Sequence, residues 1–184
     1  MFKERKNLRK VAAIAACLAV TTMFSDCKDK INGNNGQPNN SGETNNNVGC
    51  NLTASITPVS GFEKNEQAVN PQWKNKDGST VILSTDNAGG RTLEQFVTYQ
   101  QEEYKKVFPD AAFDNTVKTT VAGRDAIEYT YTYSAYPIVM KARVVNLLEC
   151  SNSKAFTITC SSLATSYESL ANDFQSMIGS YTLK

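Results

Sequence analysis

Residues 113–161 read FDNTVKTTVAGRDAIEYTYTYSAYPIVMKARVVNLLECSNSKAFTITCS. Four segments of this stretch are rich in β-branched, aromatic and aliphatic residues that alternate with polar ones, which is typical of strands. The links between the segments are only two to four residues long, so consecutive strands are expected to pair antiparallel. The predicted strands are residues 113–121, 124–133, 138–150 and 154–161.

A shorter hairpin precedes these strands. Trp73 lies before the segment 75–78 (NKDG), and residues 79–84 (STVILS) follow it. Asp-Gly at the centre of a short link is typical of a β-hairpin, because both residues tolerate the left-handed backbone of such turns. Residues 79–84 are therefore predicted to pair antiparallel with the strand that carries Trp73.

The first predicted helix begins at Thr92. Thr92-Leu93-Glu94-Gln95 has the capping-box pattern, in which the Thr92 hydroxyl accepts a bond from the Gln95 amide and the Gln95 side chain reaches back. Pro109 ends the helix, because proline lacks the amide hydrogen that a helix interior needs. The apolar face of the helix comprises Leu93, Phe96, Val97, Tyr104, Val107 and Phe108.

A second capping-box pattern, at residues 165–168, opens the second predicted helix, which ends at Gly179. Residues 180–183 are expected to form a last short strand. The whole order predicts an α+β fold, with two main helices packed against an antiparallel β-sheet in α/β/α layers. The apolar face of the second helix comprises Tyr167, Leu170, Ala171, Phe174, Met177 and Ile178.

The N-terminus has the composition of an export signal. Residues 1–10 carry five basic side chains, and residues 11–24 carry no charge. This uncharged run is shorter than the roughly 20 apolar residues that a transmembrane helix needs. We therefore predict that residues 1–26 are a signal peptide. Its removal takes away five basic and two acidic residues and changes the net charge from +1 to −2.

Two cysteines are candidates for the lipid anchor of a bacterial lipoprotein. Cys27 follows an apolar core of ordinary signal length, but Asp26 stands where such signals usually have a small residue. Cys17 follows the lipobox-like Ile14-Ala15-Ala16, but its apolar run has only six residues. Cys27 is the predicted lipidation site and Cys17 the alternative. Two or more acyl chains there hold a protein stably at a membrane.

A spacer separates this region from the folded part. Of the sixteen residues 32–47, eight are asparagine and none is aliphatic or aromatic, so this segment cannot build a core. Residues 27–49 are predicted to be an Asn/Gly-rich flexible tether. Residues 50–184 are long enough to bury one hydrophobic core, and we predict a single domain there.

Composition excludes several classes of function. The chain has 19 Lys and Arg against 18 Asp and Glu, and it has no histidine. Without histidine there is no Ser/His/Asp or Cys/His pair and no His-ligated zinc. A near-neutral chain also lacks the basic surface of a nucleic-acid binder. We therefore expect a protein that is not an enzyme and has no metal site, no cofactor and no nucleic-acid partner.

The folded part resembles the PsbP/DcrB-like superfamily. The similarity is carried by residues 71–73 (PQW), the helix at 92–108, residues 120–129 (TVAGRDAIEY) and residues 154–160 (KAFTITC), and it covers about residues 62–183. The resemblance implies a PsbP-like fold and a role in binding or assembly, because members share no catalytic residues. The metal-binding histidines of plant members have no counterpart here, so that part of the family's chemistry does not transfer.

Tyrosines form the first candidate binding surface. Tyr129, Tyr131 and Tyr133 alternate with polar residues, so their rings share one face of a strand, and Tyr136 follows in the next turn. Pairing across that turn is expected to set Val144, Ala142 and Met140 opposite the three strand tyrosines. The face is either a platform for a ligand or a surface packed under a helix, and the packed surface is favoured. On the opposite face, Glu128 is expected to pair with Arg143, and Thr130 to lie near Lys141.

Three further motifs have a functional and a structural interpretation. Residues 86–91 (DNAGGR) lead into a helix, so Arg91 and free amides are a candidate anion site, although an ordinary loop is favoured. Residues 151–154 (SNSK) match the S-x-x-K pattern of penicillin-recognising enzymes but lie in a turn and lack the partner motifs. The acidic residues near the end of the first helix are expected to be solvated, although a divalent cation is an alternative. They are Glu102, Glu103, Asp110 and Asp114.

Cysteine pairing stays open at this level. With a turn centred on residues 152–153, Cys150 is expected to face Ala155 and Cys160 to face Val145, so the two thiols point to opposite faces of the sheet. Cys160 then belongs to a core-facing row, and Cys50 is a possible partner of either cysteine.

Together these features predict an extracytoplasmic lipoprotein of a bacterial cell envelope, tethered to the outer side of the cytoplasmic membrane or to the outer membrane. Its domain is expected to be a non-enzymatic protein-binding or assembly module whose partner is another envelope protein. The alternative is a small-ligand carrier that uses the Tyr129, Tyr131 and Tyr133 face.

Overall fold

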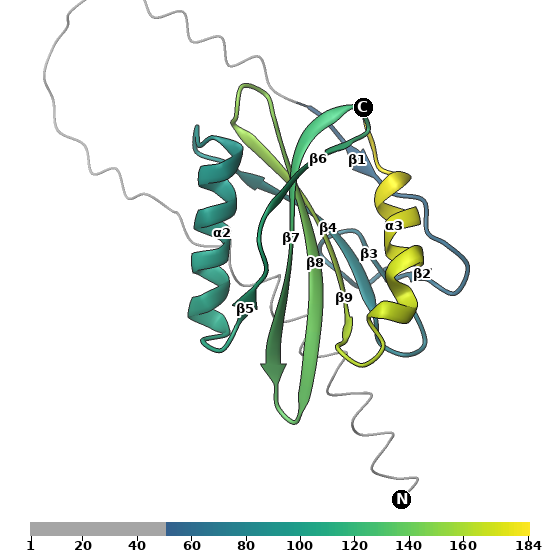
Figure 1. Ribbon diagram of the computed structural model, residues 1–184. Helices are drawn as coiled ribbons and strands as arrows, with labels where there is room; N and C mark the ends of the chain where they lie inside the picture. Colours follow the sequence, from purple (N-terminus) through teal and green to yellow (C-terminus); the bar gives the residue numbers. More distant parts are fainter. Residues whose placement is uncertain (1–50) are drawn as a thin grey trace, which may run out of the picture.

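The computed structural model describes residues 51–184, whose main antiparallel sheet has a helix on each face (Figure 1). The sheet has eight strands in the order β2-β3-β4-β9-β8-β7-β5, and β6 pairs beside β5 on the outer edge of β7. The strands are β2 (Glu63–Lys64), β3 (Gln72–Lys74), β4 (Thr80–Asn87), β5 (Ala112–Phe113), β6 (Val117–Val121), β7 (Arg124–Ala135), β8 (Ile138–Glu149) and β9 (Lys154–Leu163).

Two helices cover the sheet from opposite sides, as the sequence predicts. Helix α2 (Leu93–Val107) and helix α3 (Ala171–Gly179) flank the sheet in Figure 1, and the short 3₁₀ helix η1 (Glu168–Leu170) leads into α3. Strands β1 (Ala54–Ser55) and β10 (Thr182–Leu183) form a separate two-stranded ladder. The fold is therefore α+β in three layers.

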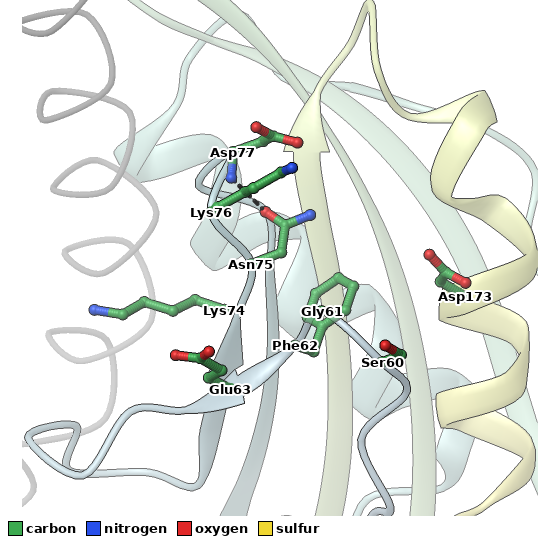
Figure 2. Close-up of a pocket in the computed structure, with 9 residues that line it drawn as sticks. All are labelled: Ser60, Gly61, Phe62, Glu63, Lys74, Asn75, Lys76, Asp77 and Asp173. Atoms are coloured by element: carbon green, nitrogen blue, oxygen red, sulfur yellow. Dashed lines mark hydrogen bonds between the residues drawn. The ribbon is translucent and has the colours of Figure 1, made fainter.

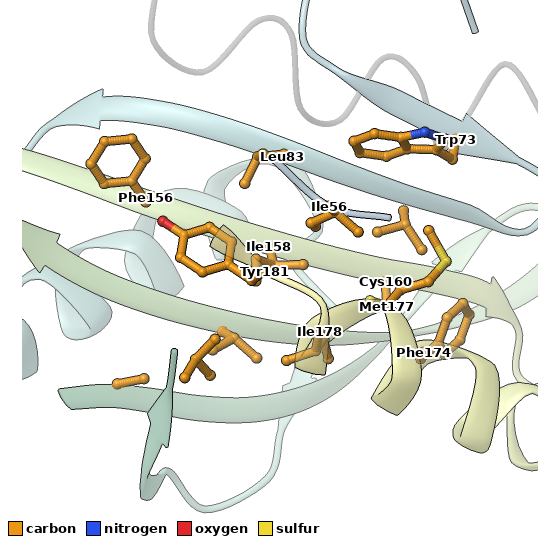
Figure 3. Close-up of a cluster of buried hydrophobic side chains, with 14 of the residues drawn as sticks. Ile56, Trp73, Leu83, Phe156, Ile158, Cys160, Phe174, Met177, Ile178 and Tyr181 are labelled. Atoms are coloured by element: carbon orange, nitrogen blue, oxygen red, sulfur yellow. The ribbon is translucent and has the colours of Figure 1, made fainter. Parts of the chain in front are cut away.

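The alternation of side chains along each strand divides the core in two. On the side of α3, buried residues of β4, β8 and β9 pack against the helix; Figure 3 shows Leu83, Phe156, Ile158 and Cys160 facing Phe174, Met177 and Ile178. The α2 side is built from Tyr129, Tyr131, Tyr133, Met140, Ala142 and Val144 with Val97 and Tyr104 of the helix.

The central register agrees with the prediction. Tyr129 pairs with Val144, Tyr131 with Ala142 and Tyr133 with Met140. The ladder ends at the pair Ala135 and Ile138, so the hairpin turn is Tyr136-Pro137. The early hairpin is also confirmed, because Trp73 pairs with Val81 across the predicted turn.

The predicted strand at residues 113–121 is wrong as a single element. Phe113 pairs with Tyr131 and Val117 with Glu128, so four steps along this edge match three steps along β7. The extra residue is a β-bulge, which separates β5 from β6 at the polar segment 114–116. The amide of Asp114 still donates to the Thr130 carbonyl at 2.9 Å, so the bulge stays attached to the sheet.

The two predicted capping boxes have different outcomes. At α2 the box is present: the Gln95 amide donates to the Thr92 hydroxyl at 3.3 Å and the Thr92 amide donates to Gln95 Oε1 at 2.9 Å. At the second helix the predicted box is wrong, because neither η1 nor α3 has a side-chain cap. There, residues 164–167 form a turn that buries Tyr167, and this turn moves the start of α3 to Ala171.

The predicted face of α2 needs one correction as well. Val107 is 45% exposed, whereas Gln100, which the apolar pattern leaves out, is 1% exposed and faces the sheet.

The turn between β8 and β9 is longer than predicted. The last pair is Glu149 with Lys154, so Cys150 leaves the strand, and Cys160 faces Arg143 instead of Val145. The cause is local: Cys150, Ser151 and Asn152 all have positive φ, between 54° and 62°. Such a left-handed run turns the chain sharply before the ladder begins.

Within residues 51–184, no helix has the length and apolar character needed to cross a membrane.

Candidate functional site

The tyrosine face is the interior of the α2 layer, the favoured interpretation from the sequence, and not the open ligand platform that is the alternative. Tyr129, Tyr131 and Tyr133 are only 1–3% exposed. The Tyr131 ring stacks on the Tyr104 ring of α2 with centroids 5.2 Å apart. The centroids of the Tyr133 and Phe108 rings are 4.3 Å apart. Burial raises the pKa of Tyr133 to about 12 and that of Tyr129 and Tyr131 well above their usual value, so these phenols stay neutral.

A hydrogen-bond network crosses this buried layer. The Tyr129 hydroxyl donates to Gln100 Oε1 at 2.7 Å, and Gln100 Nε2 donates to the Thr157 hydroxyl at 3.4 Å. Thr157 in turn donates to Asn146 Oδ1 at 2.7 Å. These partners satisfy most of the buried polar atoms, so the network ties α2 to the sheet and has no open face for a ligand.

The predicted charge pair lies on the opposite face, under α3. Arg143 Nη2 donates to Glu128 at 2.7 Å and to Gln175 of α3 at 2.7 Å. The pair is diagonal, because Thr130 is the residue directly opposite Arg143. Lys141 lies opposite Thr132, and its ammonium bonds Glu168 at 3.0 Å. These charges attach the segment 168–175 to the sheet.

Arg91 is engaged within its own loop. Its Nη1 donates to the Ala88 carbonyl at 3.0 Å, and the guanidinium lies over the Tyr99 ring at 4.4 Å from the centroid. The Gly89 amide donates to Asn87 Oδ1, and the Gly90 amide donates to the Asn152 carbonyl. With these donors in use, the segment 86–91 is a structural connection, the favoured interpretation from the sequence.

The S-x-x-K segment occupies the turn between β8 and β9, where the Ser153 hydroxyl donates to the Cys150 carbonyl at 2.8 Å. This hydroxyl closes the turn.

The acidic residues near the end of α2 are dispersed. Asp110 Oδ2 accepts the Ser134 amide at 3.0 Å, and hydrogen bonding by Ser134 lowers the pKa of Asp110. Asp114 accepts the Thr130 hydroxyl, and Glu103 pairs with Lys106. Among residues 51–184, no three acidic, cysteine or histidine side chains lie close enough to hold a metal ion.

The cysteines have distinct states. Cys160 is free and fully buried, and burial raises the pKa of its thiol to about 12. Cys150 is disulfide-bonded. Cys17, Cys27 and Cys50 lie outside the described residues, as do the predicted signal peptide and tether.

Tyr136 is the one predicted binding residue that is open to solvent. It is 92% exposed at the end of the β7–β8 hairpin, and Val139 nearby is 52% exposed. In Figure 1 this hairpin extends past the rest of the sheet, at the end of the domain opposite β1 and the C-terminus.

A cavity of about 430 Å³ lies elsewhere, between the turn after β3 and α3 (Figure 2). Asn75 Oδ1 accepts the amides of Asp77 and Ser79 and shapes the rim. Asp173 of α3 faces Asp77 from across the opening, while Lys74 points away from α3. The sequence gives no signal for this cavity, because Gly61 and Phe62 join it from a segment distant from α3. It is lined by Ser60, Gly61, Phe62, Glu63, Lys74, Asn75, Lys76, Asp77 and Asp173.

Comparisons with known proteins identify the fold. No protein-family profile and no curated protein matches the chain. The crystal structure of LpqN of Mycobacterium tuberculosis, a protein involved in cell envelope biogenesis, is similar with a TM-score of 0.54 and 12% identity over 72% of this chain and 84% of that chain. The solution structure of cyanobacterial PsbP (CyanoP) from Synechocystis sp. PCC 6803 has a TM-score of 0.53 and 11% identity over 72% of this chain and 92% of that chain. With the topology described above, these similarities show that the chain has a PsbP-like fold.

Proposed function

We propose that this protein is a membrane-tethered lipoprotein of a bacterial cell envelope, and that its PsbP-like domain binds another envelope protein without catalysing a reaction. The observation that carries the proposal is the order of segments: an export signal, then Cys27, then an Asn-rich spacer, then a domain. This is the arrangement of a domain held at a distance from a membrane.

The interior of the domain supports a binding role over a catalytic one. Tyr129, Tyr131 and Tyr133 are buried, the free thiol of Cys160 is buried with a raised pKa, and the chain has no histidine to activate a serine or cysteine. LpqN, which shares the fold, is involved in cell envelope biogenesis, and this agrees with an envelope location for the present chain.

The tether is tested by expressing the full chain in a bacterial host and measuring intact masses after membrane extraction. The wild type is expected to carry acyl chains on Cys27 and to lack residues 1–26. Cys27→Ala is expected to lose the lipid, whereas the matched variant Cys17→Ala keeps it. Lipid on Cys17, or an unacylated secreted chain, contradicts the proposed anchor.

A small-ligand carrier is a second candidate, favoured by the cavity between Asn75 and Asp173. Its size is within the range of ligand pockets, which hold small molecules by a few directed polar groups. Thermal-shift screening of the full chain with amino acids, sugars and nucleotides, repeated with Asp173→Ala, tests it. A ligand that stabilises the wild type and not the variant supports the carrier.

A further inference from the structure

The end of the β7–β8 hairpin, residues 134–141, carries two of the exposed large apolar side chains of the described domain, Tyr136 and Val139. We propose that this hairpin end docks into an apolar, uncharged cavity on another envelope protein, with the Tyr136 ring as the anchor. The proposal rests on the proposed function and adds to it the surface and the chemistry of the partner.

The hairpin end combines exposure with rigidity. Tyr136 is 92% and Val139 52% exposed, and Pro137 lies between them on the surface. Neighbouring elements hold the strands beneath this apolar surface from both sides. The Ser134 amide donates to Asp110 after α2, and the Ala164 amide donates to the Val139 carbonyl at 2.9 Å. An aromatic side chain on a rigid support loses little conformational entropy on binding, which is the property of an interface anchor.

The position of the hairpin relative to the N-terminal chain indicates which way it faces. In the proposed mature protein, residues 27–50 precede the described part, which begins just before β1, where Thr53 and Lys184 exchange backbone hydrogen bonds. The hairpin end lies at the opposite end of the domain (Figure 1). The Tyr136 end is therefore the part of the domain farthest from the point where the tether joins it, and we assign this surface to a protein and not to the anchoring lipid.

Charge defines the chemistry of the partner. Within residues 134–141 the only charged side chain is Lys141, and it bonds Glu168 at 3.0 Å and lies over the Tyr167 ring. Asp110 is engaged by Ser134. Because Lys141 is paired with Glu168 and Asp110 lies outside the hairpin, residues 134–140 offer apolar area and the Tyr136 hydroxyl, and binding through them is expected to depend little on salt.

The test places the photoreactive residue p-benzoylphenylalanine at position 136 of the full-length protein in its own bacterium. The matched control carries it at position 69, where Val69 is 88% exposed on the link between β2 and β3. Irradiation is expected to give one discrete protein adduct at position 136 and none at position 69. Co-expressed wild-type protein is expected to reduce the adduct about fivefold or more, whereas Tyr136→Ser, a surface change that leaves the melting temperature unaltered, does not compete.

Each other result overturns the proposal. An adduct with the mass of two copies assigns the surface to self-association, and a lipid adduct assigns it to a membrane. Competition by Tyr136→Ser equal to that by the wild type removes Tyr136 as the anchor, and so does an adduct yield that falls steeply between about 0.05 and about 0.5 M salt. If position 69 gives the adduct instead, the hairpin proposal fails while the binding module stands. If neither position gives one and Cys27 carries no lipid, the proposed function fails as well.

Discussion

The hydroxyl of Tyr129 donates a 2.7 Å hydrogen bond to Oε1 of Gln100, and this bond joins the middle of α2 to the centre of the sheet. Both side chains are 1% exposed. A buried polar group that loses its partner keeps the cost of its desolvation, so the two residues depend on each other.

Gln100→Leu is expected to lower the free energy of unfolding by about 1–3 kcal/mol, because it leaves the Tyr129 hydroxyl and Thr157 without a partner on α2. Urea unfolding followed by circular dichroism measures the loss. The matched control is Gln101→Leu, whose half-buried side chain is outside the network and whose effect is expected to stay within about 0.5 kcal/mol. Equal effects of the two substitutions would show that the network contributes nothing specific.

The capping box supports a second prediction about α2. Thr92→Ala removes the hydroxyl that accepts the Gln95 amide and is expected to destabilise the domain by about 1 kcal/mol. Thr98→Ala is the control, because its hydroxyl bonds only the Glu94 carbonyl on the exposed side of the helix. In a double-mutant cycle, Thr92→Ala and Gln95→Ala are expected to be non-additive, since each bonds the backbone of the other. Strict additivity would contradict a joint cap.

Asp86 predicts how stability changes with pH. Burial raises the pKa of this carboxyl to about 6, although a hydrogen bond from Ser84 opposes the shift. A folded-state pKa above the unfolded value means that the folded state holds the proton more tightly. The contribution of Asp86 to the free energy of unfolding is therefore fully present below about pH 4, and it is lost as the pH rises through 6.

Asp86→Asn is therefore expected to be more stable than the wild type at neutral pH, by on the order of 1 kcal/mol after screening, and to flatten the decline between about pH 4 and 7. Urea midpoints across this range measure the effect. Asp77→Asn, at an exposed turn, serves as the control. An unchanged pH profile in Asp86→Asn would assign the decline to other groups.

The parts of the fold that could be predicted are those fixed by short-range pattern. Alternation from Tyr129 to Tyr133 and the two-residue turn at Pro137 define one register, and a one-residue slip would move every tyrosine to the other face. The capping box at Thr92 could also be predicted, because it depends only on Thr92 and Gln95, three residues apart. The bulge at residues 114–116 could not be predicted, since β-branched residues continue on its C-terminal side.

The remaining differences come from tertiary contacts. The left-handed turn at residues 150–152 uses no glycine, so composition gives no warning of it. Tyr167 is buried in the core, and α3 therefore begins at Ala171 and not at the capping box predicted for residues 165–168. For the candidate site, alternation predicts that Tyr129 to Tyr133 share a face, but whether α2 covers that face depends on packing that no single segment encodes. Tyr136, which lies in the turn, is the only one of the four tyrosines that remains exposed.

The last prediction concerns the cysteines. Cys150 is disulfide-bonded, and Cys160 is free and buried. Cys50 is the expected partner of Cys150, because it precedes Thr53, whose backbone pairs with Lys184. Strand β10 lies next to the Thr53–Lys184 pair. Tyr181, just before β10, is close enough to Glu149 and Arg124 for their charges to affect its pKa, and Glu149 directly precedes Cys150.

Alkylation of the native, unreduced protein followed by mass spectrometry is expected to label neither Cys150 nor Cys160, since the pKa of about 12 at Cys160 leaves almost no thiolate. In Cys50→Ser, Cys150 is expected to become reactive, whereas Cys160→Ser, the control, leaves it protected. Continued protection of Cys150 in Cys50→Ser would assign its disulfide to another cysteine.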